Sequence, residues 1–277
     1  MFYPSARDVY FDNVKGKLIL LVVLGHLFEF QLSDTFFRFL YVFLYSFVMP
    51  TFIFVSGLFF KPKIKGFVRF IFIYLLSQLV FLLSYYCLGK SFSFYSFLTP
   101  VWTLWYLLCL VFWYGISLLF ERLGYSKYDI LVFSIVLTLL SGFINISYFL
   151  SLQRACAYFV FFALGMSVNK KWLKKCMQAF SVQIIVVFFI LGLIVLSSIY
   201  QASFLPKIFY NSYPYSYFSS YSEWLMFGVR LLQFMLSFVF GLFIFKFTSN
   251  NKGFYTFCGY YSLWIYLLHS FVLLHLR

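Results

Sequence analysis

Three ionisable residues near the start of the chain are spaced as acid–base chemistry would require. His26 lies within an apolar stretch, Lys15 precedes it by eleven residues and Glu29 follows it by three. If residues 14–32 form one helix, Lys15 and His26 share a face about 16 Å apart along the axis, and Glu29 can reach the imidazole. A neutral imidazole can act as a general base, and a carboxylate can fix its tautomer. The pattern predicts a catalytic pair, His26 with Glu29; the alternatives are a packed histidine and a solvated Glu29 at the outer membrane surface.

Basic residues gather at the predicted ends of three apolar stretches on one side of the membrane. Lysine and arginine match the phosphates of a nucleotide-like donor. Lys15 and Arg69 stand at helix starts, so we expect these two to contact such a donor. The alternative is that the cations only mark topology and contact lipid headgroups. The group consists of Lys15, Lys17, Lys61, Lys63, Lys65 and Arg69.

Four further residues could bind substrate or support the site. Arg154 and Arg230 lie in apolar stretches near the predicted outer side, where an arginine needs a partner or an aqueous cavity. Structural pairing and substrate binding both explain them. His269 lies within the last apolar stretch, where packing and catalysis are the alternatives. Trp105 is an interface anchor or part of a cavity lining.

The composition requires that these residues be positioned by membrane helices. Of the 277 residues, 64% are hydrophobic and 10% are charged, whereas a soluble domain carries about 25% charged residues. The net charge of +14 comes from cations that flank apolar stretches, which is typical of positive-inside topology and argues against a nucleic-acid partner. The five cysteines are scattered without CxxC spacing, so neither a disulfide nor a metal site is expected. Residues 1–15 are polar and predict no cleavable signal peptide.

Nine apolar stretches are each close to the length that a bilayer requires. With the N-terminus in the cytoplasm, fifteen lysines and arginines fall on the inner side and five, among them Lys90 and Arg277, on the outer side. The sequence therefore predicts an all-α, polytopic bundle of about nine transmembrane helices, a single domain over residues 1–277. Pro50 could kink the second helix. The stretches are approximately 17–33, 36–60, 67–88, 100–120, 129–145, 150–168, 180–200, 224–248 and 255–275.

The longest outer segment, about 201–223, is rich in tyrosine, serine and asparagine. Flat aromatic faces beside hydrogen-bonding groups are suited to a carbohydrate acceptor. An aromatic belt at the membrane interface is the alternative.

Several segments resemble acyltransferase family 3, a family of membrane-bound acyltransferases, and are most similar to its bacterial branch of fucose 4-O-acetylase-like proteins. Lys15 and His26 match the family's Arg/Lys-x10-His motif. The other matching segments follow in the family's order across nearly the whole chain. They are Met49–Phe60, Leu104–Leu108, Arg154–Gly165 and Ser262–His269.

The resemblance implies a protein of the bacterial plasma membrane that moves an acetyl group from cytosolic acetyl-CoA to a sugar hydroxyl. The acceptor would be a capsule or other cell-surface polysaccharide, or its lipid-linked precursor. By the resemblance, His26 is catalytic and Lys15 contacts the donor. Arg69 matches an arginine that starts the family's third helix, while Arg154 and His269 match recurrent positions. Acetyl-CoA is the co-substrate, and no metal is implied.

Three features depart from the family pattern. Val48 stands where many relatives have a second histidine, and no proline follows Arg69 in the third helix. The sequence ends soon after the matching His269 segment, where relatives usually continue through a tenth helix. A C-terminal truncation is one interpretation of this difference.

The residues leave the mechanism and the class of function open. His26 could deprotonate the sugar hydroxyl directly, or it could first accept the acetyl group as a nucleophile. A flippase for lipid-linked sugars would use the same cations without acyl transfer. A polysaccharide polymerase would depend instead on the outer arginines. The concentration of unusual residues in the first helix favours the transferase.

Overall fold

The computed structural model describes residues 7–87, 89, 98–146, 149–200 and 205–275, and every regular element in these ranges is a helix. This confirms the all-α class. Six helical segments are long and apolar enough to cross a membrane, or seven if the bent pair α12 (Phe254–Tyr260) and α13 (Ser262–His275) counts as one span. The six are α2 (Thr35–Leu58), α3 (Ile64–Cys87), η2 with α5 (Trp102–Leu104 and Trp105–Arg122), η4 with α7 (Phe149–Ser151 and Leu152–Ser167), α9 (Val182–Ile199) and α11 (Glu223–Lys246).

The other two predicted spans form helices that differ from these six. Helix α6 (Lys127–Leu140) has 14 residues, about 21 Å, which is short against a hydrocarbon thickness of about 30 Å. Helix α1 (Val9–Phe28) has 20 residues but carries Asp12, Lys15 and Lys17. The count of nine spans and the cytoplasmic N-terminus therefore stay predictions. Lys90, Arg277 and residues 201–204 of the predicted outer segment lie outside the described residues.

The chain divides into two compact units, which are described separately. The first unit holds α1, most of α2, α8 (Lys170–Ala179), α9, α10 (Leu205–Phe209), most of α11, and α12 and α13. The second unit holds α3, α5, α6, α7 and the short helix η5 (Tyr215–Tyr217). Helices α2 and α11 each contribute residues to both.

Helix α1 begins earlier than the sequence pattern predicts. We expected a start at Val14, but the Asp8 carboxylate accepts a hydrogen bond from the backbone N–H of Tyr10 and caps the helix five residues sooner, at Val9. The helix ends at Phe28, and a short 3-10 turn, η1 (Glu29–Gln31), follows. Lys15 and His26 therefore share one uninterrupted helix.

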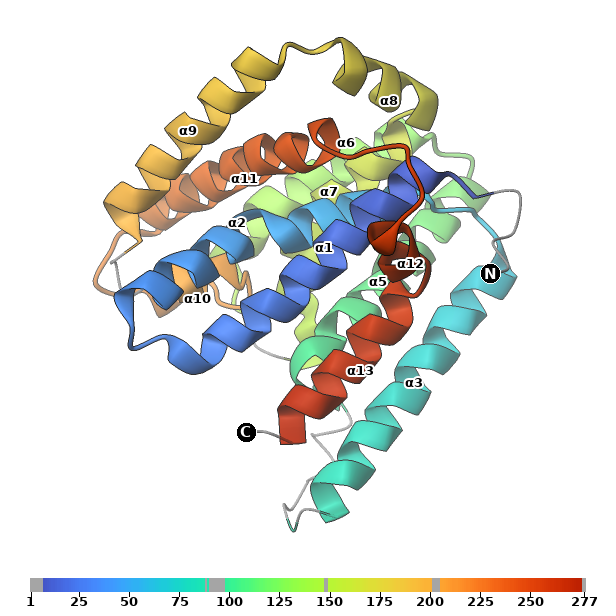
Figure 1. The fold of residues 1–277 in the computed structure, drawn as a ribbon. Helices are drawn as coiled ribbons and strands as arrows, with labels where there is room; N and C mark the ends of the chain where they lie inside the picture. The colour runs from blue at the N-terminus through green and yellow to red at the C-terminus, as the bar shows by residue number, and fades with distance from the viewer. Residues whose placement is uncertain (1–6, 88, 90–97, 147–148, 201–204, 276–277) are drawn as a thin grey trace. The chain divides into compact units, whose positions relative to one another are not determined.

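Helix α1 packs against α12 with the two backbones almost in contact (Figure 1). A Cβ atom on Gly16 would lie 1.9 Å from the carbonyl oxygen of Tyr255, and one on Gly259 would lie 1.7 Å from that of Asp12. Only glycine fits at either position. The close approach brings the Thr256 hydroxyl within 2.6 Å of the Asn13 side-chain oxygen, to which it donates.

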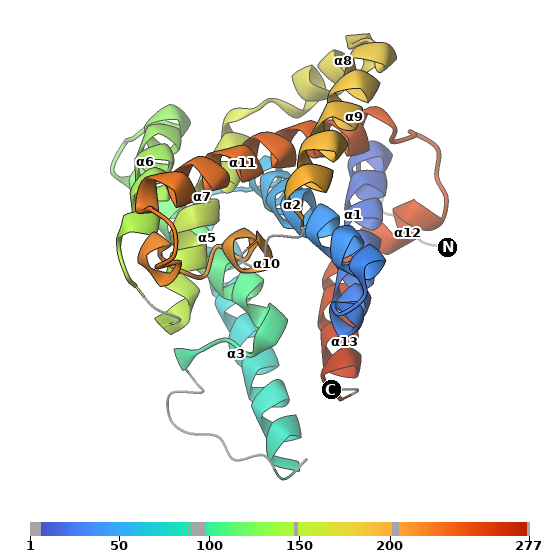
Figure 2. The ribbon, with the colours of Figure 1, turned by 90° about the vertical axis from the view of Figure 1, so that its left-hand side faces the viewer.

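The predicted span 255–275 is wrong as a single helix. The chain bends by 80° between α12 and α13, at Tyr261. The break lets α12 pack on the first half of α1, while α13 contacts α1 with residues further along (Figures 1 and 2). One straight helix held at Gly259 could not make both sets of contacts.

Helix α8 has no counterpart among the predicted stretches. Its Leu173 and Met177 are buried and its Lys171 and Lys175 are exposed, so it is an amphipathic helix too polar to read as a span. The Lys246 ammonium, from the end of α11, donates to the carbonyl oxygens of Met177 (2.8 Å) and Gln178 (3.2 Å) and so caps the helix.

In the second unit, α5, α6 and α7 are neighbours (Figure 2). The Trp113 indole N–H donates to the Ala155 carbonyl oxygen at 2.7 Å, and the Thr138 hydroxyl donates to that of Cys156 at 2.9 Å. Both bonds satisfy polar groups inside an apolar bundle. Helix α2, whose last residues belong to this unit, continues through Pro50 without interruption.

Candidate active site

His26 and Glu29 meet at the end of α1. The Glu29 carboxylate lies 3.1 Å from Nδ1 of His26. Glu29 is held in this place because its backbone N–H still bonds to the Gly25 carbonyl oxygen as the α-helix tightens into η1. A carboxylate can only accept, so we assign the proton to Nδ1 and the lone pair to Nε2. The His26 side chain is buried, at 8% exposure.

A second imidazole lies against the first. The His269 ring from α13 stacks on the His26 ring, with 5.6 Å between centroids and an interplanar angle of 30°. Its Nδ1 lies 3.0 Å from the Ile265 carbonyl oxygen, one helical turn back, and donates to it. Tyr45 of α2 presents its ring edge-on to His26 at 6.3 Å. Residues from α1, α2 and α13, all in the first unit, therefore surround the imidazole.

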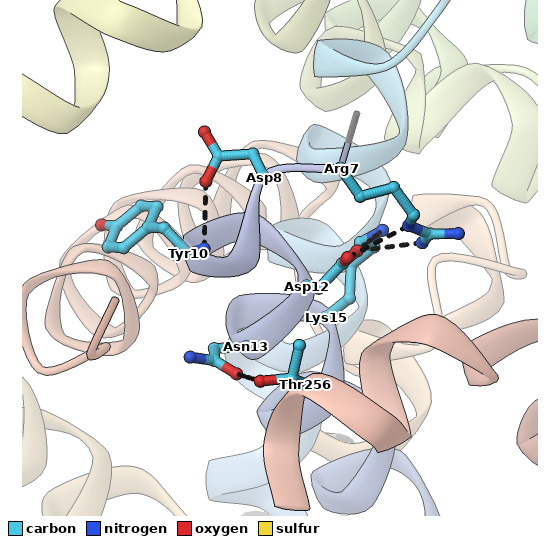
Figure 3. A network of polar contacts seen from close by, with 7 residues as sticks. All are labelled: Arg7, Asp8, Tyr10, Asp12, Asn13, Lys15 and Thr256. Atoms are coloured by element: carbon cyan, nitrogen blue, oxygen red, sulfur yellow. Dashed lines mark hydrogen bonds and ion pairs between the residues drawn. The ribbon is translucent and has the colours of Figure 1, made fainter. Parts of the chain in front are cut away.

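The start of α1 holds a cluster of charges around one buried carboxylate (Figure 3). The Lys15 ammonium lies 2.6 Å from the Asp12 carboxylate, and Arg7 binds the same carboxylate with Nη2 at 2.9 Å and Nε at 3.1 Å. Asp12 is 3% exposed. The Arg7 guanidinium also lies 4.6 Å over the ring of Tyr260, at the end of α12. One buried carboxylate thus balances two cations, of which Lys15 is partly buried and Arg7 is exposed.

Sequence reasoning named Lys15 but missed Asp12 and Arg7. The spacing of Asp12 and Lys15, three residues apart on one helix, was a usable signal for the pair. The contact of Arg7 could not be read from the sequence, because Arg7 precedes the helix and its direction is set by α12.

Arg230 lies on α11 in the first unit and is 2% exposed. One turn further along the same helix, the Gln233 side chain donates to the Phe209 carbonyl oxygen at 3.2 Å. The inner side of this part of α11 is therefore polar, which fits the expectation that a membrane arginine is turned away from lipid.

Three predicted site residues belong to the second unit. Arg69 is exposed on α3. The Arg154 guanidinium lies 4.9 Å over the Trp105 ring, and its Nε donates to the Tyr210 carbonyl oxygen at 3.1 Å. Trp105 is buried and stacks on Tyr158. These contacts pair Arg154 with Trp105 and with the Tyr210 backbone, while substrate binding by either residue and a donor contact of Arg69 stay predictions.

The arrangement in the first unit suits proton transfer. Glu29 can fix the tautomer of His26 and stabilise the imidazolium that forms when Nε2 accepts a proton. Among the described residues, no three His, Cys, Asp or Glu side chains gather as metal ligands would.

The long apolar helices indicate a polytopic membrane protein, and the His26–Glu29 pair among them is a candidate acid–base site. The family model described as an acyltransferase domain, that of acyltransferase family 3, matches residues 8–277. The chain therefore belongs to this family and is a multi-pass membrane acyltransferase. Comparison with curated proteins and with solved structures gave no match.

Proposed function

We propose that the protein transfers an acetyl group from cytosolic acetyl-CoA to a sugar hydroxyl of a bacterial cell-surface polysaccharide or of its lipid-linked precursor. The observation that carries this proposal is the contact between His26 and Glu29 in a chain that belongs to an acyltransferase family. Membership of that family disfavours a flippase or a polymerase, neither of which transfers an acyl group.

In the direct mechanism, Nε2 of His26 removes the proton from the sugar hydroxyl. The hydroxyl oxygen then attacks the thioester carbonyl carbon, the C–S bond breaks and the CoA thiolate leaves. The imidazolium returns its proton to the thiolate, so the site ends as it began. Glu29 supports the charge on His26 between the two proton transfers.

The alternative mechanism has two steps. His26 first attacks the thioester and forms an acyl-imidazole with loss of the CoA thiolate, and the sugar hydroxyl then takes the acyl group from the imidazole. Glu29 fixes the same tautomer in both routes. His269 stacks on His26 and so positions the ring.

Lys15 would hold a phosphate of the donor on the cytosolic side, and a contact of Arg69 with the donor stays a prediction. The 2.6 Å contact between Lys15 and Asp12 means that a phosphate must compete with a carboxylate for the ammonium group. This competition favours a dianionic phosphate, which carries the larger charge. Lys15 lies about 16 Å from His26 along α1, a separation that an extended pantetheine arm can cover.

The aromatic segment between α10 and α11 is our candidate for the acceptor contact. Its Tyr213 and Tyr217 rings are in contact, with centroids 4.2 Å apart and an interplanar angle of 33°, and Tyr217 and Tyr221 are exposed. Arg154 holds the start of this segment through the Tyr210 carbonyl oxygen. Exposed rings on a fixed segment support stacking against a sugar.

The proposal is tested by replacing His26 with alanine and measuring the acetyl content of the surface glycan by NMR. We expect the acetyl signals to be lost, since general-base catalysis contributes about 10²- to 10⁴-fold. His275→Ala is the matched control, because His275 is exposed at the end of α13 and its hydrogen bond within the described part of the chain goes to the Phe271 carbonyl oxygen of its own helix. Retention of the acetyl signals by His26→Ala, at unchanged membrane abundance, would contradict the mechanism.

A further inference from the structure

Helix α8 of the first unit stands at the start of a span that faces lipid. Phe180 and Ser181 separate it from α9, and the chain changes direction between the two helices (Figure 1). Helix α9 has no charged residue, and apolar side chains such as Val182 and Ile184 are exposed from its first turn. Since such side chains face the lipid tails in a bilayer, α8 lies at the level of the lipid headgroups.

The apolar face of α8 is already packed against protein. Leu173 and Met177, one helical turn apart, are both buried. The Lys246 ammonium, which caps α8, also donates to the Phe180 carbonyl oxygen, so the turn before α9 is held to the end of α11. A surface helix usually binds a bilayer by burying its apolar face among the lipid tails. Helix α8 instead presents its opposite, polar face to its surroundings, in a fixed orientation.

The outward face of α8 carries two lysines and a tryptophan. Lys171, Trp172 and Lys175 are all exposed, Trp172 at 60%. Lys171 and Lys175 are one helical turn apart, so their ammonium groups can reach the same anion. Lysine and tryptophan are residue types that membrane proteins place at the interface with water, where the indole ring lies among the headgroups. The face therefore matches the chemistry of a headgroup layer.

The charge of α8, with four lysines and no acidic residue, is balanced only in part within the described chain. The Lys174 ammonium lies 3.8 Å from the Asp8 carboxylate and 5.2 Å from the centroid of the Tyr10 ring. Lys171 and Lys175 form no ion pair within the described part of the chain. Lys171 also stands in the first turn, where the helix dipole is positive and disfavours a cation. An anion beside this face would relieve both the repulsion between the lysines and the dipole penalty.

We propose that the outward face of α8 is a binding site for an anionic phospholipid, which on the predicted topology belongs to the cytosolic leaflet. The phosphodiester lies between Lys171 and Lys175, and the Trp172 ring lies where the lipid tails begin. The continuity with α9 favours lipid over an acidic protein segment, because lipid covers the exposed faces of both helices at once. None of these residues takes part in the proposed acyl transfer.

The test measures quenching of Trp172 by brominated lipids in phosphatidylcholine nanodiscs that hold the full-length protein. The Trp172 signal is the difference in fluorescence between each protein and its Trp172→Phe version, which removes the contribution of the other tryptophans. Brominated phosphatidylglycerol, which is anionic, should half-quench this signal at a mole fraction at least about 5-fold lower than brominated phosphatidylcholine. The reason is that each lysine beside an anionic lipid surface contributes about a 5-fold preference.

Three double variants identify the lysines that carry the preference. Lys171→Gln with Lys175→Gln should abolish it, so that both brominated lipids quench Trp172 at the same mole fraction. Lys171→Arg with Lys175→Arg should keep it, because arginine also binds phosphate. Lys63→Gln with Lys65→Gln removes the same charge from exposed positions outside α8, and this matched control should keep the preference as well.

Equal quenching by the two lipids in the wild type would overturn the inference, since Trp172 would then contact lipid without selecting its charge. Quenching by neither lipid would also overturn it, because α8 would be covered by protein. The inference is equally wrong if the preference survives the glutamine substitutions in α8. It is wrong, too, if the matched control loses as much, because the preference would then follow the total charge of the protein.

Discussion

Helices α1 and α9 belong to the same unit and have opposite characters. Helix α1 carries Asp12, Asn13 and His26, and all three are buried. Helix α9 has no charged residue and a mean hydropathy of 2.8, yet only 17% of it is buried. The more apolar helix is thus the more exposed one, because lipid is the solvent for α9 while protein groups must satisfy the polar side chains of α1.

The same contrast extends to the glycines of the two helices. Gly16 of α1 faces backbone atoms of α12, whereas Gly192 of α9 faces the ring of Phe240, 2.9 Å from an added Cβ. An aromatic side chain can move aside, but a helix backbone carrying its own contacts cannot. The packing of α1 is therefore specific, and that of α9 is tolerant.

The largest difference in stability between the two helices is expected when one methyl group is added to each of these glycines. Gly16→Ala should destabilise the protein by about 2–3 kcal/mol, because α12 must move to accommodate the Cβ. Gly192→Ala should cost about 1 kcal/mol or less. Thermal unfolding of the two variants in detergent measures the difference; equal melting temperatures would show that the α1–α12 contact is not as close as described.

A smaller effect is expected from the charged half of α1. Lys15→Ala should raise the KM for acetyl-CoA by about 10-fold, the size of one charge-assisted hydrogen bond to a phosphate, with a smaller change in kcat. Lys17→Ala is the matched control, since the Lys17 ammonium bonds to the Phe247 carbonyl oxygen. An unchanged apparent affinity for acetyl-CoA would remove Lys15 from the donor site.

The smallest effect should come from the outer face of α9. Val187 is 54% exposed, and Val187→Leu exchanges one apolar surface for another. The melting temperature and the acetyl content of the glycan should both match wild type, within the roughly 0.5 kcal/mol typical of surface substitutions. A clear loss of activity would indicate that α9 contacts a partner or substrate in addition to lipid.

The sequence pattern predicted the positions of most helices but not their interruptions. Helices α2, α3, α9 and α11 lie close to the predicted stretches because a long apolar run is itself the signal for a span. The pattern missed α8, whose alternating lysines and apolar residues lower the mean hydropathy. It also missed the break at Tyr261, where no proline stands and where the preceding Gly259 packs against the backbone of α1, at the other end of the chain.

The contacts of the candidate site are likewise of two kinds, those that residue spacing predicts and those that it does not. That Lys15 and His26 share a helix, and that Glu29 can reach His26, followed from residue spacing, since the repeat of a helix fixes which side chains are neighbours within it. That His269 stacks on His26, and that Arg7 joins Lys15 on one carboxylate, was decided only by tertiary structure. These contacts depend on how α12 and α13 fold back onto α1 from the other end of the chain, and no local rule encodes a contact over such a separation.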